Sequence, residues 1–360
     1  MRIVLAPDSF KGTVAATEAA RALADGWRSV RPDDQLLIRP MADGGEGTLA
    51  ALAAAHPGTT PYRVDGCTGP DGRPVSGAYA LLSDGTAVVE LAVASGLPLM
   101  RDLAPLSATT RGTGETIAAA LDQGADRLLI ALGGSASTDG GTGLLYALGL
   151  RLLDADGVQL PDGGGELARA RTVDAGSLRP PPGDVRLLTD VTNPLLGPDG
   201  AAAVYGPQKG AGPLDISRLE AGLARLGELL GGDPAAPGAG AAGGAAYGLT
   251  ATWGAAVTPG AAAIADLVGL DQALSGADLV VTGEGRFDAT SLRGKAVGEV
   301  IRRADRAGVR CEVVAGESAD PRAVTLTGLA GGRAEARGNA VHWLYRAGAR
   351  LAASAAHAGG

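Results

Sequence analysis

The chain repeats one pattern: a short apolar run, a turn rich in glycine and acidic residues, and then a segment with helical spacing of apolar residues. Arg2–Ala6 and Gln35–Arg39 are two such runs, and the turns that follow them contain Asp8 and Asp43. Short runs of aliphatic and β-branched residues next to turns predict buried strands. Their alternation with helices predicts parallel pairing with right-handed crossovers, and therefore an α/β fold.

The length of 360 residues exceeds what one hydrophobic core usually supports, so we expect two domains. Hydrophobic residues make up 46% of the chain and aromatic residues only 3%, which favours sheets of Val, Ile and Leu covered by helices. We predict a Rossmann-like parallel-sheet domain from residues 1–60 and 258–360. A second, mixed α/β domain is inserted at residues 61–257, and we expect the active-site cleft to lie between the two.

The inserted domain begins with a different pattern. From Pro61 to Leu99, β-rich segments are separated by the pairs Asp65-Gly66, Asp71-Gly72 and Asp84-Gly85, which predicts antiparallel hairpins. Towards the C-terminus we expect a helix over Ala262–Ala277 and a strand over Leu279–Thr282. The chain after Gly316 lacks the apolar strand and helix expected to complete the first domain, although Trp343–Ala353 has helical spacing.

The charge and cysteine content exclude several classes of protein. The net charge is −8, and no cluster of Lys and Arg is long enough to follow a nucleic-acid backbone. No apolar run approaches the roughly 18 residues of a membrane span. The chain has only two cysteines, which fits a reducing compartment. We therefore expect a cytoplasmic protein that binds neither nucleic acid nor membranes.

The acidic turns point to phosphoryl transfer. In open α/β sheets, ligands bind at the edge where parallel strands end, and seven acids follow predicted strands: Asp8, Asp43, Glu46, Asp139, Asp190, Glu284 and Asp288. Carboxylates gathered at one edge repel each other unless a cation lies between them, and Mg²⁺ bound to ATP supplies that charge. Among the cations, Lys11 is the best candidate to neutralise a transferring phosphoryl group, ahead of Arg286 and Lys295.

Each of these features also has a structural explanation. Glycine-rich turns can simply connect strand to helix, and a single carboxylate at a strand end caps a helix more often than it binds a metal. Asp43 and Asp190 are exceptions, because Gly44-Gly45 and Asn193-Pro194 follow them where a cap requires neither. The common nucleotide-binding fingerprints are incomplete: Gly112-x-Gly114 has no third glycine at residue 117.

Several longer phrases resemble the bacterial glycerate kinase family (type I, glycerate 2-kinase) over about residues 1–300. They are Ala6–Gly12, Met41–Thr48, Gly133–Ala136 with Asp139–Gly141, Asp190–Leu195, Gly206–Ala211, Gly240–Gly244 and Gly283–Arg286. The resemblance implies ATP-dependent phosphorylation of D-glycerate with Mg²⁺, giving 2-phosphoglycerate if the 2-hydroxyl is the acceptor. It leaves open the choice between the 2- and 3-hydroxyl, and also the oligomeric state, with a homodimer as one alternative.

The resemblance also implies roles for individual residues. The catalytic residues would be Lys11, Asp43, Asp190 and Asn193, with Asp43 or Asp190 as the base, Lys11 as the transition-state cation, and Asp43 and Asp190 as metal ligands. The nucleotide-binding residues would be Gly44, Gly45, Glu46, Gly47, Thr48, Gly133, Gly134, Ser135 and Asp139. The substrate-binding residues would be Asp8, Ser9, Glu284, Arg286 and Asp288.

The sequence departs from the family pattern at two places near these residues. Ala289-Thr290-Ser291 replaces Gly-Gln-Thr, so the side-chain amide donor is lost at Thr290, and Thr138 replaces the usual Asn. An alternative function is therefore a catalytically weakened protein that still binds a nucleotide or hydroxy acid. A nicotinamide-dependent reductase is disfavoured by the incomplete fingerprint.

Overall fold

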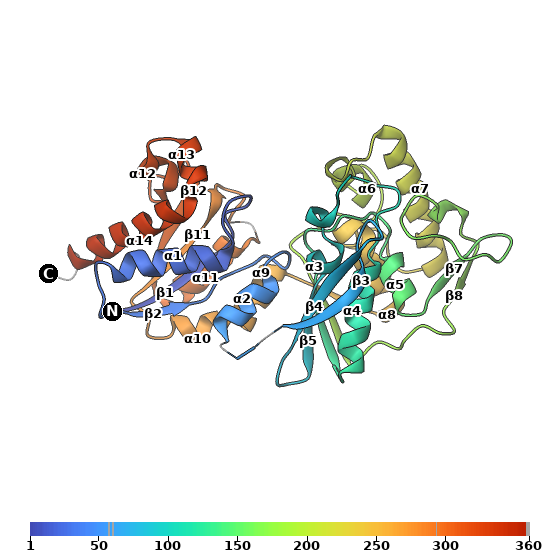
Figure 1. The fold of residues 1–360 in the computed structure, drawn as a ribbon, viewed down its shortest axis with the longest axis horizontal. Helices are drawn as coiled ribbons and strands as arrows, with labels where there is room; N and C mark the ends of the chain where they lie inside the picture. Colours follow the sequence, from blue (N-terminus) through green and yellow to red (C-terminus); the bar gives the residue numbers. More distant parts are fainter. Residues whose placement is uncertain (57, 60, 293, 358–360) are drawn as a thin grey trace. The chain divides into compact units, whose positions relative to one another are not determined.

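The chain forms two compact units in a computed structural model that describes residues 1–56, 58–59, 61–292 and 294–357 (Figure 1). The first unit contains Met1–Asp43, Ala50–Gly58 and Ala261–Gly360, and the second contains Gly44–Leu49 and Thr59–Gly260. Within the described ranges, no helix is both long and apolar enough to cross a membrane.

The first unit is built on a five-stranded sheet in the order β13-β12-β11-β1-β2, and every pair in it is parallel. The strands are β1 (Arg2–Pro7), β2 (Gln35–Ile38), β11 (Leu279–Phe287), β12 (Arg310–Ser318) and β13 (Val324–Thr325). In the centre, β1 and β11 are buried over most of their length, as their continuous apolar runs require.

Helices cover this sheet on both faces. They are α1 (Ala16–Arg28), α2 (Thr48–Ala55), α9 (Gly260–Leu267), α10 (Leu270–Leu274), α11 (Ala296–Ala307), α12 (Leu326–Ala330), α13 (Arg333–Gly338) and α14 (Ala340–His357). The α1 and α14 helices share one core with Val314 of β12, whereas Val297 of α11 packs with the next residue, Ala315. Adjacent residues of a strand point to opposite faces, so the helices form two layers around the sheet.

The second unit contains a mixed six-stranded sheet in the order β10-β9-β6-β5-β4-β3. Its strands are β3 (Tyr62–Thr68), β4 (Pro74–Leu81), β5 (Thr86–Glu90), β6 (Arg127–Ala131), β9 (Asp184–Leu188) and β10 (Ala256–Thr258), and a separate ribbon pairs β7 (Arg151–Leu153) with β8 (Thr172–Asp174). The β3-β4 and β4-β5 pairs are antiparallel and the others in the large sheet are parallel. The predicted α/β class, with one parallel and one mixed sheet, is confirmed.

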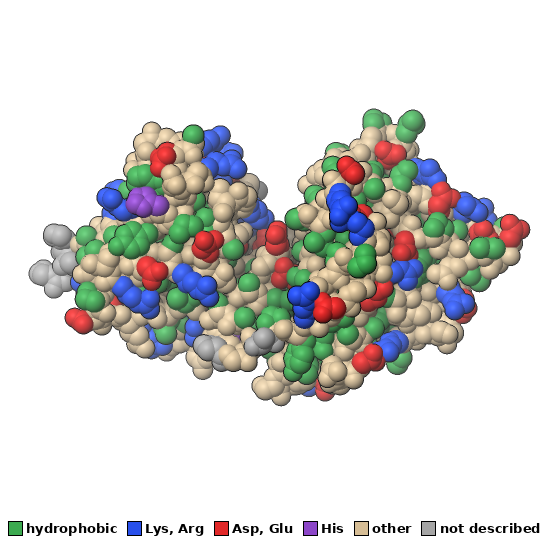
Figure 2. Space-filling view, viewed as in Figure 1, with side chains coloured by type: hydrophobic (Ala, Val, Ile, Leu, Met, Phe, Trp, Pro, Cys, Tyr) green, Lys and Arg blue, Asp and Glu red, His purple; other side chains and the backbone are tan. Residues whose placement is uncertain are grey.

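The helices of the second unit enclose a core of Leu, Ile, Val and Ala side chains. They are α3 (Leu91–Ser95), α4 (Arg111–Asp122), α5 (Thr142–Ala147), α6 (Ala201–Tyr205), α7 (Pro213–Leu230) and α8 (Ala245–Trp253), with short 3₁₀ helices at Leu97–Leu99, Leu167–Arg169, Pro207–Lys209 and Ala241–Gly244. On the face drawn in Figure 2, positive and negative side chains are interspersed rather than gathered by sign.

Two predictions within these elements are wrong. Asp71-Gly72 and Asp84-Gly85 do lie between paired strands, but Asp65-Gly66 lies inside β3, where the register with β4 shifts between Val64 and Cys67. This glycine serves an irregularity in the strand rather than a hairpin turn. The helix expected over Ala262–Ala277 is two helices, because Gly269 adopts a left-handed conformation with φ of 65° and ends the first of them.

The C-terminal region also differs from expectation. After Gly316 the chain does form one more strand, β13, which is only two residues long. The helices α12, α13 and α14 follow it. The segment expected as a turn after Thr282 instead continues β11 through Phe287, because it pairs with β12 up to Ser318. Hydrogen bonding to a neighbouring strand thus overrides the turn preference of Gly283 and Gly285.

Close approach of α1 and α14 depends on two glycines. A Cβ atom added at Gly26 would lie 1.9 Å from the carbonyl oxygen of Tyr345, and one added at Gly348 would lie 2.2 Å from that of Leu23. The two backbones therefore touch at positions where no side chain fits.

We predict that Gly348→Ala lowers the free energy of unfolding by about 1–3 kcal/mol, because the added methyl group must separate the helices. Thermal unfolding checks this. Gly338→Ala is the control, since a Cβ atom there would meet no atom within 4 Å, and its effect should stay within about 0.5 kcal/mol. Equal effects of the two substitutions would contradict the packing argument.

Candidate active site

The first unit contains a pocket of about 440 Å³ at the edge where its parallel strands end. We call it the first-unit pocket. Seven of the predicted catalytic and substrate-binding residues line it: Asp8, Ser9, Lys11, Asp43, Glu284, Arg286 and Asp288. Residues separated by up to 280 positions in the sequence therefore meet in one hollow.

Strand order explains this convergence. Strand β1 lies between β2 and β11, and all three run in the same direction. Asp8 directly follows β1, and its backbone N–H donates to the carbonyl oxygen of Gly283 at 2.8 Å. Glu284 is the next residue of β11. A Cβ atom at Gly285 would lie 3.5 Å from the Phe10 backbone, an ordinary van der Waals distance, so the first loop lies directly against this strand.

Asp8 is the most perturbed acid of the pocket. Its side chain is buried, and burial together with the nearby Asp43 carboxylate raises the pKa of Asp8 to about 7. The backbone N–H of Ser9 donates to Oδ1 of Asp8 at 2.6 Å and opposes this shift, as does the charge of Lys11. At neutral pH this carboxyl group can therefore either accept or donate a proton.

Lys11 and Asp43 form the only ion pair of either residue within the described ranges, with 3.6 Å between Nζ and Oδ2. The Asp43 carboxylate raises the pKa of Lys11, so the ammonium group stays charged. The Lys11 side chain is 78% exposed, and an exposed pair of this kind adds little to stability. Its charge is available to a ligand.

Two further acids of the pocket have different environments. Burial raises the pKa of Glu284, and its Oε1 atom has no hydrogen-bond partner, so a cation or a donor from a ligand would satisfy it. The pKa of Asp288 is lowered, because the hydroxyl and backbone N–H groups of Thr290 donate to its Oδ1 atom at 2.6 and 2.8 Å. The atypical Thr290 thus supplies a hydroxyl donor in place of the missing side-chain amide.

The second unit has its own pocket of about 300 Å³, which we call the second-unit pocket. Four sequence-predicted nucleotide-binding residues line it: Glu46, Gly133, Gly134 and Ser135. The buried side chain of Lys209 also lines it, and its Nζ atom donates to Oγ of Ser135 at 2.9 Å and to the carbonyl oxygen of Ser137. Burial lowers the pKa of Lys209 to about 8.

Two of the remaining predicted glycines, Gly44 and Gly45, have structural reasons to be glycine. A Cβ atom at Gly45 would lie 2.8 Å from Cα of Gly133, and one at Gly44 would lie 2.9 Å from the Leu188 backbone. The loop before α2 therefore packs directly on the ends of β6 and β9. These contacts explain Gly44-Gly45 without a ligand.

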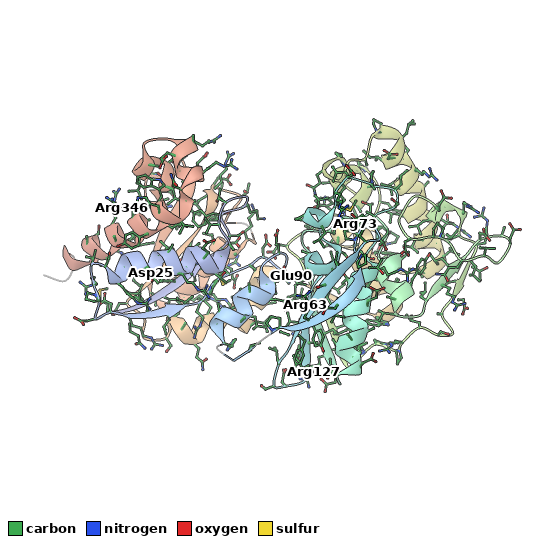
Figure 3. All side chains as sticks on the ribbon, in the orientation of Figure 1. Asp25, Arg63, Arg73, Glu90, Arg127 and Arg346 are labelled. Atoms are coloured by element: carbon green, nitrogen blue, oxygen red, sulfur yellow. The ribbon has the colours of Figure 1, made fainter. Side chains whose placement is uncertain are left out.

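The amide groups at the start of α2 already have an acceptor. Glu90, at the end of β5 (Figure 3), accepts hydrogen bonds from the backbone N–H groups of Gly47 at 2.8 Å and Leu49 at 3.0 Å. Thr48 donates its hydroxyl to the carbonyl oxygen of Gly45 at 2.7 Å. An internal carboxylate thus occupies the position where we expected phosphate oxygens.

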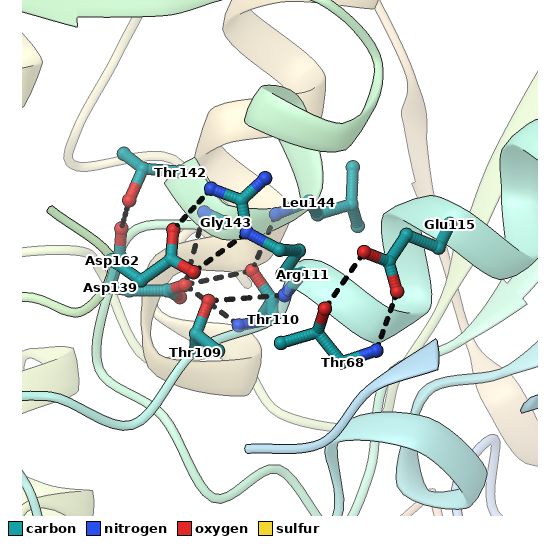
Figure 4. A network of polar contacts seen from close by, with 10 residues as sticks. All are labelled: Thr68, Thr109, Thr110, Arg111, Glu115, Asp139, Thr142, Gly143, Leu144 and Asp162. Carbon is teal, nitrogen blue, oxygen red and sulfur yellow. Dashed lines mark hydrogen bonds and ion pairs between the residues drawn. The ribbon is translucent and has the colours of Figure 1, made fainter. Parts of the chain in front are cut away.

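Asp139 is the centre of a buried network (Figure 4). Its carboxylate accepts hydrogen bonds from Oγ1 and N–H of Thr110 and from N–H of Gly143, which Figure 4 draws. Two more come from Oγ of Ser137 and N–H of Gly141, which makes five. The side chain is fully buried. Asp139 therefore shapes the loop that carries Ser135, rather than lining either pocket.

Asp190 and Asn193 also make contacts within the second unit. Oδ1 of Asp190 accepts from the backbone N–H of Gly260 at 2.8 Å. Asn193 donates to the carbonyl oxygen of Asp199 at 2.8 Å and accepts from the hydroxyl of Tyr205 at 2.7 Å. Thr189 and Val191, on either side of Asp190, line the second-unit pocket.

Comparison with known proteins shows which family the chain belongs to. The model of the glycerate kinase family matches residues 3–332. The chain belongs to the glycerate kinase family. It is 42% identical to glycerate 2-kinase of Escherichia coli (strain K12), over 82% of this chain and 80% of that protein. It is also 42% identical to glycerate kinase of Bacillus subtilis (strain 168), over 91% and 88%.

A solved structure has the same fold as this glycerate kinase family member. It is a crystal structure from Salmonella typhimurium LT2, provisionally described as glycerate kinase 2, with a TM-score of 0.84, 38% identity and 99% coverage of both chains. These comparisons confirm the family that the motifs predict. They also confirm the predicted class of enzyme, a kinase and therefore a phosphotransferase.

Sequence reasoning missed several pocket residues. Lys209 of the second-unit pocket was not singled out, nor were Glu317, Arg333 and Arg337, which line the first-unit pocket. One signal was available for Lys209. The chain has only three lysines, Lys11, Lys209 and Lys295, and each of them lines one of the two pockets. In a chain that otherwise uses arginine, a retained lysine marks a place where a compact charge is needed.

We predict that Asp8 makes folding stability depend on pH. Its pKa rises from 3.8 to about 7 on folding, so stability that is present below pH 4 is lost as the pH rises through about 7. Asp8→Asn removes this loss. The variant should gain about 2–3 kcal/mol relative to the wild type between pH 5 and pH 8, at about 1.4 kcal/mol per pKa unit. Urea unfolding at both pH values measures the difference, and an equal difference at both would refute the shift.

Proposed function

We propose that the protein transfers the terminal phosphoryl group of ATP to the 2-hydroxyl of D-glycerate, giving 2-phosphoglycerate and ADP. Family membership supports the use of ATP and glycerate, and the relative from Escherichia coli is named a glycerate 2-kinase. The observation that carries the proposal is the cluster of Asp8, Asp43 and Lys11. It combines carboxyl groups that can handle the hydroxyl proton with a cation for the developing phosphate charge.

The first-unit pocket suits a small hydroxy acid. Its wall carries three arginines, Arg286, Arg333 and Arg337, whose guanidinium groups are natural partners for a carboxylate. Arg286 and Arg333 are partly balanced by acids, with Nε of Arg286 3.4 Å from Oδ2 of Asp288 and Arg333 paired with Glu317. We propose that these residues, with Ser9 and Glu284, bind and orient glycerate.

The catalytic base is Asp43 or Asp190 in this proposal. A carboxylate that accepts the hydroxyl proton makes the acceptor oxygen a better nucleophile, and Lys11 stabilises the charge on the transferring group. Asn193 positions the loop that carries Asp190, since its side-chain amide binds Asp199 and Tyr205.

The nucleotide is proposed to bind at Glu46, Gly133, Gly134 and Ser135 in the second-unit pocket, on a frame formed by Gly44, Gly45, Gly47, Thr48 and Asp139. Magnesium, when bound, would neutralise phosphate oxygens. No group of three or more His, Cys, Asp or Glu side chains in the described part of the chain is arranged to hold a metal ion by itself. Magnesium that is held mainly by phosphates needs only one or two carboxylates, and we propose Asp43 and Asp190.

The other expectations from sequence remain predictions: a cytoplasmic location, a homodimer, and an active-site cleft between the predicted domains 1–60 with 258–360 and 61–257. Light scattering of the purified protein tests the dimer.

We expect the purified protein to release ADP from Mg-ATP only when D-glycerate is present, with phosphate appearing on the 2-hydroxyl. A coupled ADP assay gives the rate, and phosphorus NMR of the product distinguishes 2- from 3-phosphoglycerate. L-glycerate is the control. ADP-binding without turnover at saturating D-glycerate would favour the catalytically weakened binding protein, and a 3-phosphate product would contradict the proposed acceptor.

Substitution of the two candidate bases should separate their roles. Asp190→Asn keeps an acceptor oxygen for the N–H of Gly260, so the fold should persist while kcat falls by about 10²-fold or more. Asp43→Asn should in addition raise the magnesium concentration required for half-maximal rate. Steady-state kinetics over a magnesium series measures both. A near-wild-type rate in either variant removes that residue from the catalytic set.

A further inference from the structure

Lys209 is a buried cation without a paired anion. Its side chain is only 2% exposed, and no described carboxylate lies within ion-pair distance of it. Asp139 acts on it through space, but both oxygens of Asp139 are already held by Thr110, Ser137, Gly141 and Gly143. Burying an unpaired ammonium group is costly, so a buried lysine of this kind normally has an anionic partner.

The hydrogen bonds of Lys209 leave one donor for that partner. An ammonium group has three N–H donors, and Lys209 gives two of them to Oγ of Ser135 and the carbonyl oxygen of Ser137. Both acceptors belong to the loop that follows β6, so they fix the ammonium group at one point of the wall of the second-unit pocket. The third donor has no acceptor among the hydrogen bonds of the described residues, and Lys209 lines this pocket.

The rest of the wall is suited to the same anion. Gly133 and Gly134 expose backbone without side chains beside Ser135. On another part of the wall, Ala242 has a φ of 52°, the only positive φ of a non-glycine residue in the described ranges. Such a conformation costs free energy and is found most often at ligand-binding sites. This observation is independent of the lysine and points to the same pocket.

We propose that Lys209 binds the phosphate chain of the nucleotide in the second-unit pocket, and that Ser135 and the Ser137 carbonyl group position its ammonium group. The proposal rests on the proposed use of ATP, and it adds a residue to which neither the family comparison nor the sequence analysis gave a role. A compact ammonium group suits this place better than guanidinium, because it is enclosed on two sides by Ser135 and Ser137.

Proton linkage follows from the same geometry. Burial lowers the pKa of Lys209 to about 8, and a bound phosphate chain would raise it again by supplying the missing negative charge. Near pH 8 the free protein carries a mixture of protonated and neutral Lys209. Binding of ADP should therefore take up protons at that pH.

The test is isothermal titration calorimetry of the full-length protein with ADP at pH 8 in two buffers of different ionisation enthalpy. For the wild type we expect proton uptake on binding. Lys209→Met keeps the apolar stem and removes the charge, so ADP affinity should fall at least tenfold and the proton uptake should disappear. Arg346→Met is the control, because Arg346 is an exposed cation that lines neither pocket, and its ADP affinity and proton uptake should match the wild type.

Three results would overturn the proposal: unchanged ADP affinity in Lys209→Met, proton uptake that persists in it, or an equal loss of affinity in Arg346→Met. If Lys209→Met does not fold, Ser135→Ala takes its place. We expect a smaller loss of ADP affinity in this variant, and an unchanged affinity would count against the proposal. Failure of the proposed function is distinguishable, because it appears as absent turnover of D-glycerate by the wild type, whatever the ADP titration shows.

Discussion

Direct contact between backbone segments, at positions where only glycine fits, is the constraint on which the rest of this structure depends. A Cβ atom at Gly283 would lie 2.0 Å from the carbonyl oxygen of Val314, and one at Gly316 would lie 2.4 Å from that of Gly285. These contacts bring the ends of β11 and β12 together below the first-unit pocket. In the second unit, Gly45 and Gly133 meet in the same way. Ligand-facing loops are thus held by close packing of the main chain, which rotamer changes cannot loosen.

Acidic residues serve two different purposes on this framework. Glu90 and Asp139 are buried and use their oxygens for backbone N–H groups and hydroxyls of neighbouring loops, so they fix loop shape. Asp8, Asp43 and Glu284 line the first-unit pocket, where Asp43 and Glu284 raise the pKa of Asp8 and all three raise the pKa of Lys11. The difference lies in the number of internal donors that each carboxylate meets. A carboxylate with all its donors supplied by the protein has little capacity left for a ligand.

Much of this arrangement could be anticipated. The strand ends that carry Asp8 and Asp43 and the parallel order of the first sheet follow from apolar runs and the glycines after them. Gly269 shows where such reasoning fails, since nothing in the local spacing distinguishes one helix from two with a left-handed residue between them. The prediction that β11 ends before Gly283 fails for another reason. The strand that pairs with this segment, β12, lies about thirty residues further along the chain.

By itself, the sequence determined the α/β class, the family, and the strand ends that precede Asp8 and Asp43, because apolar period and turn composition are local properties of the chain. Only the tertiary structure decided which of several similar acids line a pocket. Asp8 and Asp139 each come after a predicted strand, yet one lines a pocket and the other accepts five internal hydrogen bonds. The burial of Lys209 was equally invisible, since it depends on Ser135 and Ser137, more than seventy residues away. Burial and hydrogen-bond partners are set by neighbours from distant segments, and no local pattern encodes them.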